Sequence, residues 1–430
     1  MERYFETLEK IFNLRGGLID LRLDRMSQAL ELFNHPENQF PSLHIAGTNG
    51  KGSTAALLHN ILQHAGYRTA LYTSPHLESF TERIRIGQKE IAQAEVVSLA
   101  DEIWQRTAAA HVPLTFFEFI TVMAFIYFAR KRVDVAVVEV GLGGRLDATN
   151  VVTPLVSVIT TISKDHEAYL GPDELSIARE KAGIVKPRIP VVCGKVSEPV
   201  TKLLQDTARM RESPAYFLGI SFSFLLKNER LFDYIGMKQN LSDLTLGLRG
   251  RHQLANAALA LAALELVNQH FPVAETVIRQ GLETVRWPGR LEVMAESPLV
   301  ILDGAHNPEG VRALVDALLD LRRGRKIRIL FATMADKEWQ LMLGTLAPLA
   351  NEIVFTRVAM ERSADPELLA KSIPAQVSKR VIHEPKTALA ALLETAQRDD
   401  IVVVAGSLYL LGEVRPILAK ASSNDVISPA

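Results

Sequence analysis

Cysteine, aromatic side chains and net charge are all scarce in this chain of 430 residues. Cys193 is the single cysteine, which excludes an internal disulfide and a metal site built from several cysteines. It lies in an apolar, strand-like run, so we expect a buried core residue, and a lone cysteine fits a reducing compartment. Lysine and arginine number 48 against 49 acidic residues, for a formal net charge of −1. The charge balance therefore predicts no nucleic-acid partner.

Long apolar runs are missing as well. The most apolar stretch, residues 119–129, is about half of the ~20 residues that a bilayer-spanning helix needs, and Glu118 and Arg130 flank it. Glu2 and Arg3 open a segment of alternating charge that lacks the apolar region of a secretory signal. We expect a cytoplasmic protein with no membrane partner, in which residues 119–129 form a buried helix.

The length, together with a hydrophobic content of 48%, predicts two folded domains. Short apolar runs alternate with helical patterns from residue 42 to about residue 193, which is typical of a parallel sheet covered by helices on both faces. A second alternating series begins near residue 297, and the Pro-Gly pair within residues 286–290 is interpreted as a linker. Residues 195–250 give no clear pattern beyond a strand-like run at 216–226. The expected strands are residues 41–46, 69–72, 133–140, 155–162 and 189–193, followed by 298–302, 326–332, 352–358 and 400–405.

A glycine-rich segment separates the first predicted strand from a helix predicted over residues 53–65. It reads Gly47, Thr48, Asn49, Gly50, Lys51, Gly52, Ser53. The backbone N–H groups of such a turn, with the N-terminus of the helix, converge on an anion. Lys51 would reach a terminal phosphate, and Ser53 is a candidate for the metal side. The spacing departs from the standard P-loop because Gly52 separates the lysine from the serine, yet a nucleotide phosphate loop explains the segment better than an ordinary capped turn.

Polar side chains follow several of the predicted strands. Glu139 ends one strand, Asp165 and His166 follow the next, and Ser74 follows the strand at 69–72. Ligands of open α/β sheets collect at this edge, and such a set suits Mg²⁺, although histidine is an unusual ligand for it. Taken alone, His166 is better explained as a helix cap or a core histidine, and Lys181 could equally be a solvated lysine.

The second series offers a similar strand end. Asp303 and His306 follow its first strand, where an aspartate is well placed to accept a hydrogen bond from a ribose or an adenine. Asn256 and Arg290 are further candidates, although each could also be a surface residue. Together these residues suggest a nucleotide held by both domains, a common location for a small-molecule cleft.

Five motifs occur in an order that resembles the folylpolyglutamate synthase and dihydrofolate synthase family, relatives of the Mur ligases. The resemblance extends from about residue 20 to about residue 415. The matching runs are residues 44–53 (HIAGTNGKGS), 74–77 (SPHL), 139–150 (EVGLGGRLDATN), 179–183 (REKAG) and 303–308 (DGAHNP).

The resemblance implies an α/β fold with a P-loop-containing, parallel-sheet ATPase domain over residues 1–294 and a smaller, Rossmann-like α/β ligase domain over residues 295–430. It also implies a reaction. With ATP and Mg²⁺, a carboxylate of dihydropteroate or the γ-carboxylate of a folate becomes an acyl phosphate, which the amine of L-glutamate attacks to form an amide. The carboxylate and the γ-phosphate of ATP are both anions and must approach each other in this reaction. Lys51, the metal and amide donors would offset their repulsion.

The same resemblance implies roles for individual residues. Lys51, Lys181 and His166 would be catalytic, and Lys181 would carry a carbamate that makes it an anionic metal ligand. The predicted Mg²⁺ ligands are Ser74, Glu139 and His166. The predicted nucleotide contacts are the loop from Gly47 to Ser53 with Asn256, Arg290, Asp303 and His306. The predicted pterin pocket contains Thr115, Phe117, Leu146, Asp147 and Ala148.

Two alternatives stay open. A cell-wall Mur ligase uses the same chemistry but carries a UDP-binding domain before its phosphate loop, and only 46 residues precede Gly47. A nucleotide-gated binding protein would hydrolyse ATP without forming an amide. The near-zero charge and the lack of a coiled-coil heptad make a monomer the default expectation.

Overall fold

The computed structural model describes residues 2–14 and 22–424 and divides into two compact units. The first comprises Met1–Gly247 with Gln253–Val285, and the second comprises Leu248–His252 with Arg286–Ala430. The predicted boundary between residues 294 and 295 lies inside β12 (Glu292–Glu296), which pairs with β13 (Leu299–Leu302). Because this hairpin cannot be split, β12 goes with the second unit, which begins at Arg286.

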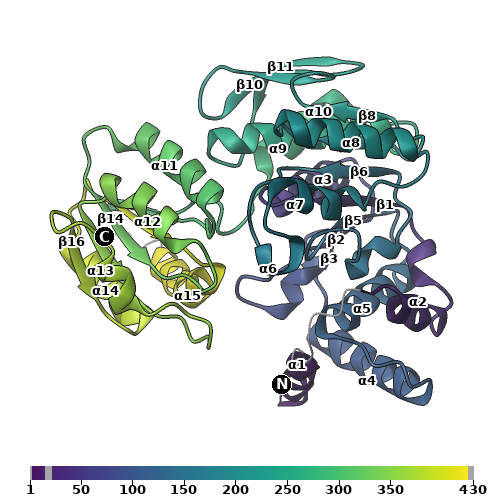
Figure 1. The fold of residues 1–430 in the computed structure, drawn as a ribbon, viewed down its shortest axis with the longest axis horizontal. Coiled ribbons are helices and arrows are strands. Elements are labelled where there is room, and N and C mark those ends of the chain that lie inside the picture. Colours follow the sequence, from purple (N-terminus) through teal and green to yellow (C-terminus); the bar gives the residue numbers. More distant parts are fainter. Residues whose placement is uncertain (1, 15–21, 425–430) are drawn as a thin grey trace. The chain divides into compact units, whose positions relative to one another are not determined.

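An eight-stranded sheet forms the centre of the first unit (Figure 1). Its strands run parallel from β2 to β8, and β3 and β4 are added antiparallel at one edge. The order is β4 (Lys89–Glu90), β3 (Ile84–Ile86), β2 (Thr69–Tyr72), β5 (Val135–Glu139), β1 (Ser42–Ala46), β6 (Val156–Ile159), β7 (Val191–Cys193), β8 (Ala215–Phe217).

Helices cover both faces of this sheet. Figure 1 shows α3 and α5 on opposite sides of the strands, as the unbroken apolar strands predict. A smaller antiparallel sheet follows, with β11 (Asn240–Thr245), β10 (Leu231–Ile235) and β9 (Ser223–Leu226) in that order. The helices are α1 (Glu2–Asn13), α2 (Asp24–Glu31), η2 (Pro36–Asn38), α3 (Lys51–His64), η3 (Phe80–Arg83), α4 (Gln93–Ala109), α5 (Phe116–Arg130), η4 (Ala148–Val151), α6 (Glu167–Leu170), α7 (Glu174–Ala182), α8 (Glu198–Met210), α9 (Arg251–Val267) and α10 (Glu275–Thr284).

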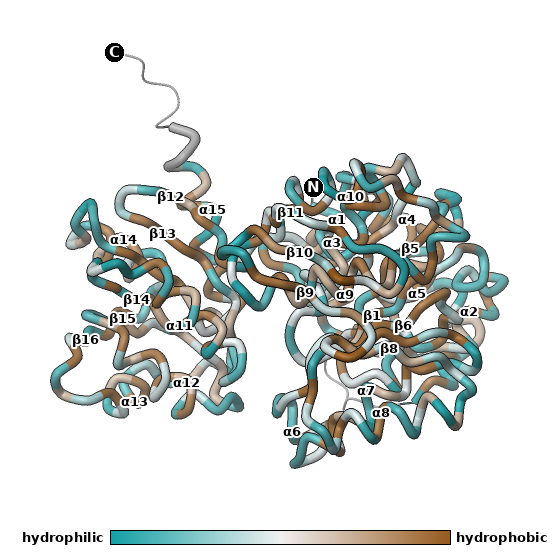
Figure 2. The backbone as a smooth tube through the Cα atoms, turned by 90° about the horizontal axis from the view of Figure 1, so that it is seen from above, coloured by the Kyte–Doolittle hydropathy of each residue, from teal (hydrophilic) through white to brown (hydrophobic). Residues whose placement is uncertain are grey.

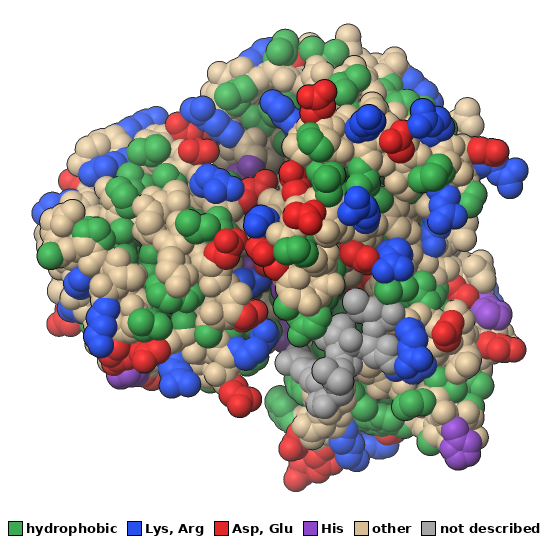
Figure 3. Space-filling model, in the orientation of Figure 1, with side chains coloured by type: hydrophobic (Ala, Val, Ile, Leu, Met, Phe, Trp, Pro, Cys, Tyr) green, Lys and Arg blue, Asp and Glu red, His purple; other side chains and the backbone are tan. Residues whose placement is uncertain are grey.

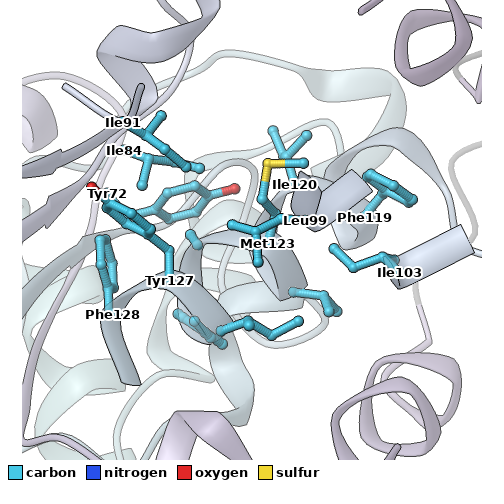
Figure 4. Packing of buried hydrophobic residues seen from close by; sticks show 14 of the residues in the cluster. Tyr72, Ile84, Ile91, Leu99, Ile103, Phe119, Ile120, Met123, Tyr127 and Phe128 are labelled. Carbon is cyan, nitrogen blue, oxygen red and sulfur yellow. The ribbon is translucent and has the colours of Figure 1, made fainter. Parts of the chain in front are cut away.

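Helix α5 contains the run predicted to be a buried helix and fills one of the cores. Eleven of its residues, from Glu118 to Phe128, are buried. In Figure 4 Phe119, Met123 and Phe128 of this helix pack among side chains of β2, β3 and α4. An apolar stretch of this length therefore lies inside a globular core, and in the described part of the chain no helix is long and apolar enough to cross a membrane.

The second unit is built on a six-stranded sheet. Parallel strands β13, β17, β14, β15 and β16 are joined by helices, and β12 is antiparallel at the edge. Figure 2 shows apolar residues along these strands and more polar residues in the outer turns. The remaining elements are β14 (Ile327–Phe331), β15 (Glu352–Phe355), β16 (Ser378–Val381), β17 (Ile401–Ala405), α11 (Pro308–Arg322), α12 (Trp339–Leu346), η5 (Ala347–Leu349), α13 (Pro366–Lys371), α14 (Pro385–Thr395) and α15 (Leu408–Asn424).

The α/β class predicted from the sequence is confirmed, and each of the nine expected strands is present. The strand-like run at 216–226 is the exception, because β8 and β9 divide it between two sheets. Gly219, at φ +87°, turns the chain between them. Side chains of both charge signs are interspersed over the visible face of each unit, as the balanced composition leads one to expect (Figure 3).

Two histidines of the first unit are expected to weaken the fold in acid. Burial lowers the pKa of His44 to about 3 and that of His59 to about 4. The unfolded chain, with histidine pKa values near 6.5, binds more protons than the folded chain below that pH, so stability falls as the pH drops. Between pH 6.5 and pH 5 each histidine should cost about 2 kcal/mol of unfolding free energy.

Denaturant unfolding at pH 7.5 and pH 5 measures this effect. The parent protein loses unfolding free energy between pH 7.5 and pH 5, and this loss should be smaller by about 2 kcal/mol in His59→Gln. The comparison holds whatever the substitution does to stability at pH 7.5. His111→Gln, at an exposed histidine, serves as the control. An unchanged loss in His59→Gln contradicts the assignment.

Candidate active site

The glycine-rich loop joins β1 to α3 at the carboxyl edge of the first sheet. Gly50 caps α3 with φ +84°, and a Cβ atom at this position would lie 2.4 Å from Asn256 Oδ1. A Cβ atom on Gly47 would lie 1.8 Å from Thr160 Oγ1. Only glycine fits both places. The helix begins at Lys51, two residues before the predicted start, because Gly50 supplies the left-handed turn that begins it.

Hydrogen bonds fix this loop against the segment that follows β6. The amide of Thr48 donates to Thr161 O at 2.8 Å, and the amide of Asn49 donates to Thr161 Oγ1 at 3.0 Å. In return, Ser163 N donates to Thr48 Oγ1 at 3.1 Å. The connections that leave β1 and β6 run toward opposite edges of the sheet, so the loop lies at a topological switch point, where ligands of such sheets bind.

The ammonium group of Lys51 is held at the centre of the loop. Its Nζ atom donates to Gly47 O at 3.0 Å and to Thr48 O at 3.2 Å. Ser53, one turn into the helix, is buried. Asn256 of α9, whose Nδ2 atom donates to Gln253 Oε1 at 2.9 Å, lies against Gly50. The structure therefore brings Asn256, which is distant in sequence, against the loop that contains the predicted nucleotide residues Lys51 and Ser53.

Two of the three predicted metal ligands are adjacent. Glu139 is the last residue of β5 and is buried, and Ser74 N donates to Glu139 Oε2 at 3.2 Å. His166 has a left-handed backbone at φ +53° and begins α6, and its Nε2 atom lies 3.8 Å from Asp165 Oδ1. Over residues 2–14 and 22–424, no cluster of three or more His, Cys, Asp or Glu side chains could hold a metal ion. A metal here would need hydroxyl, phosphate or other oxygen ligands as well.

Lys181 lies in the last turn of α7 with only 3% of its surface exposed. Burial and, to a smaller extent, the positive charge of Lys51 lower the pKa of its amine to about 7, against the opposing effects of Asp165 and Asp147. The solvated reading considered for this lysine is wrong. A pKa lowered this far makes the neutral form of the amine accessible near neutral pH.

The predicted pterin residues come from two segments that meet. Thr115 caps α5 and accepts a hydrogen bond from Glu118 N, and the ring of Phe117 lies against Gly141, where a Cβ atom would be 2.4 Å from Cζ. Asp147 caps η4 and is buried, as is Ala148, while Leu146 is half-buried. Burial raises the pKa of Asp147 against the effect of its hydrogen bonds.

The second unit gathers its own predicted residues at the end of β13. Asp303 accepts hydrogen bonds from Leu291 N at 2.9 Å and Ala305 N at 3.0 Å. Burial raises the pKa of Asp303, and the positive charge of Arg290 lowers it. His306 Nδ1 lies 2.8 Å from Gly304 O. Asp303 and His306 thus share one strand end, as the sequence predicts. Arg290, which the sequence places at the linker, lies beside them, since a Cβ atom on Gly304 would be 2.2 Å from Arg290 Nη1.

Comparisons with known proteins agree with this arrangement. The description "Mur ligase middle domain" matches residues 45–264, and "Mur ligase, glutamate ligase domain" matches residues 289–408. The dihydrofolate synthase/folylpolyglutamate synthase of Bacillus subtilis is 34% identical over 409 residues, which cover 91% of this chain and 94% of that protein. The chain belongs to this family of Mur ligases.

Solved structures of family members resemble the chain along its length. E. coli FolC in complex with DHPP and ADP has a TM-score of 0.90 at 32% identity and covers 97% of this chain and 98% of its own. The bifunctional folylpolyglutamate synthase/dihydrofolate synthase of Yersinia pestis, complexed with AMPPNP and Mn ion, has a TM-score of 0.88 at 34% identity and covers 96% and 98%. The resemblance inferred from the five motifs is confirmed.

The sequence analysis did not predict one group of residues that supports the phosphate loop. Thr160, Thr161 and Ser163 follow β6 and hold the phosphate loop. Thr160 Oγ1 donates to Asn49 O at 2.6 Å, in addition to the bonds of Thr161 and Ser163 described above. The sequence carried a weak signal for them, because hydroxyl residues at the end of a buried strand mark the edge where ligands collect. That β6 lies directly beside β1 is not visible in the sequence.

Proposed function

We propose that the chain is an ATP-dependent ligase that joins L-glutamate to dihydropteroate, to the γ-carboxylate of folates, or to both. The observation that carries this proposal is the anchored phosphate loop, in which Lys51 Nζ is held on the carbonyl oxygens of Gly47 and Thr48. The buried Lys181 lies against the segment that follows Glu139, where a Cβ atom on Gly144 would be 3.1 Å from Lys181 Cα. A site with two lysines, the Glu139 carboxylate and the loop amides suits the transfer of a phosphoryl group to an acid. The activity named for the family relatives agrees with it.

The reaction proceeds in two substitutions. An oxygen of the acceptor carboxylate attacks the γ-phosphorus of ATP, the bond to the bridging oxygen breaks, and ADP leaves. The amine of glutamate then attacks the acyl carbon, phosphate leaves with the former carboxylate oxygen, and the nitrogen loses a proton. The acceptor carboxylate and the γ-phosphate are both anions and repel each other as they approach in the first step. Lys51 and the loop amides offset this negative charge.

The residues present fit a hard divalent cation in part. The Glu139 carboxylate and the neighbouring Ser74 are oxygen donors of the kind that Mg²⁺ takes, together with phosphate oxygens and water. We propose Ser74, Glu139 and His166 as the residues that hold it. When bound, the ion offsets negative charge on the transferring phosphate.

Lys181 is proposed to carry a carbamate. Its neutral amine would form a bond to the carbon of CO₂ and release one proton, which leaves an anionic oxygen donor in place of a cation. Burial and the lowered pKa support this chemistry, because a protonated amine cannot attack CO₂. The change of sign would also remove the repulsion between Lys181 and Lys51.

The remaining predicted contacts are proposed for the two larger substrates. The acceptor would bind where Phe117 meets the loop of residues 141–150, and the nucleotide at the phosphate loop with Asn256. Arg290, Asp303 and His306 are proposed as further nucleotide contacts. We expect the protein to act as a monomer in the cytoplasm.

One assay tests the proposed function. Purified protein is supplied with ATP, Mg²⁺ and labelled glutamate, and with either dihydropteroate or tetrahydrofolate. We expect labelled amide product and ADP in equal amounts, both dependent on glutamate. ADP released at the same rate without glutamate would instead indicate a nucleotide-hydrolysing binding protein.

Gly141→Ala should weaken acceptor binding. The new methyl group would lie 2.4 Å from the Phe117 ring, so the ring must move out of its place beside the 141–150 loop. We expect the KM for dihydropteroate to rise about tenfold, the equivalent of ~1.4 kcal/mol, and the KM for ATP to stay unchanged. Steady-state kinetics with each substrate varied in turn measures both. Gly344→Ala is the control, because this glycine of α12 has open space around it and no left-handed backbone. An unchanged acceptor KM places the acceptor elsewhere.

A further inference from the structure

A buried chain of hydrogen bonds runs from β1 to the 141–150 loop. His44 Nε2 lies 2.9 Å from Thr149 Oγ1, and this hydroxyl also bonds to Asp147 Oδ1. His44 and Thr149 have no exposed surface, and Asp147 has 5%. Polar groups buried this deeply are costly unless they are paired, so the chain has a structural reason to persist.

The direction of the chain follows from its donors. A threonine hydroxyl has one proton and the Asp147 carboxylate only accepts, so the Thr149 proton goes to Asp147 and the hydroxyl accepts from the Nε2–H of His44. The other ring nitrogen of His44, Nδ1, is buried and has no hydrogen-bond partner among the described residues. Among the described residues, the hydrogen bond to Thr149 is therefore the one that the His44 ring makes.

The Asp147 carboxylate is occupied by the loop itself. Its Oδ1 atom accepts from the amide of Thr149 at 3.0 Å as well as from the hydroxyl, and Oδ2 accepts from the amide of Leu142 at 2.9 Å. The amide of Gly141 also faces the carboxylate. A carboxylate offers about four acceptor positions, so Asp147 joins both ends of the loop and keeps little capacity for a ligand.

We propose that His44, Thr149 and Asp147 are positioning residues, which hold the 141–149 loop in the conformation that binds the acceptor acid. Asp147 then acts on the loop, and the loop acts on the acceptor. Strand β1 continues from His44 into the phosphate loop at Gly47. The hydrogen bonds from His44 to Asp147 therefore also fix the acceptor loop relative to the phosphate loop. This inference rests on the proposed function for the identity of the acceptor.

Thr149→Val tests the chain because it keeps the side-chain shape and removes the hydroxyl. We expect the Kd for dihydropteroate, measured by calorimetry in the presence of ADP, and the KM for dihydropteroate to rise about tenfold or more. The KM for ATP should stay within about twofold, which corresponds to less than about 0.5 kcal/mol. Thr149→Ser restores the hydroxyl and should restore both constants.

Two further variants keep the test decisive. His44→Leu removes the outer donor alone and should raise the same constants by about threefold, and it decides the question by itself if Thr149→Val does not fold. Thr107→Val, at a buried threonine that bonds within its own helix, controls for the loss of a buried hydroxyl. An acceptor Kd within twofold of the parent protein in Thr149→Val and His44→Leu, or a parallel rise in the KM for ATP, overturns the inference. If the parent protein binds dihydropteroate but forms no amide, the result counts against the proposed function and not against the positioning role of His44, Thr149 and Asp147.

Discussion

Lys51→Met is expected to lower the turnover of amide formation by about 1,000-fold. The ammonium of Lys51 is held on the carbonyl oxygens of Gly47 and Thr48, at the centre of the phosphate loop. Such a preorganised charge stabilises the transferring phosphoryl group without reorganisation during the reaction. Methionine keeps most of the side chain's length and removes the charge, so the loop should fold as before.

Labelled glutamate incorporation at saturating substrates measures this loss. Lys202→Met, at an exposed lysine on α8, should keep parental turnover, and the thermal unfolding midpoint of Lys51→Met should match that of the parent protein. Lys51→Arg should fail to rescue, because a planar guanidinium does not replace a compact ammonium inside the loop. Turnover in Lys51→Met within tenfold of the parent would show that the loop does not bind the reacting phosphate.

Lys181→Ala is expected to abolish turnover, with formate or acetate partly restoring it. Removing the side chain removes the proposed carbamate, so the loss should exceed the ~100-fold that an outer-shell change at a metal site typically costs. A small carboxylate can enter the space that the side chain leaves and supply an anionic oxygen in its place. The amine of Lys181, with its pKa lowered to about 7, is suited to take up CO₂ at neutral pH.

The rescue distinguishes a chemical role from a packing role. Formate should have no effect on Lys51→Met, which lacks a cation and not an anion. The dependence on formate concentration should saturate, as expected for binding at one site. Parental turnover in Lys181→Ala would remove the role of this lysine.

The strands and the phosphate loop could be predicted because their signals are local. Continuous apolar runs define β1, β5 and β6, and glycines followed by lysine define the loop. The edge strand β16 was not predicted, because Ser378–Val381 is mostly polar and half-exposed. In the small sheet, β9 lies within the strand-like run at 216–226, but β10 and β11 were not predicted. The alternation of β10 spans only five residues, and the buried and exposed residues of β11 do not alternate cleanly.

The site could be predicted only where its residues follow strands. Parallel strands bring their carboxyl ends together, so Glu139 and Ser74 were expected as neighbours, and they are. The contact of Asn256 with Gly50 depends on the packing of α9, which no local pattern records. The part played by His44 was invisible as well, because a histidine within an apolar strand gives no sign of its distant partner Thr149.

The position of β1 in the middle of its sheet limits how the protein could be re-engineered. This strand is enclosed by β5 and β6 and has no exposed residue, and both the nucleotide loop and the His44 anchor depend on it. A library of variants that seeks a new acid should therefore leave β1 intact and diversify half-buried loop positions such as Leu142 and Leu146. Changes that shift the backbone of this strand would disturb both reactants together.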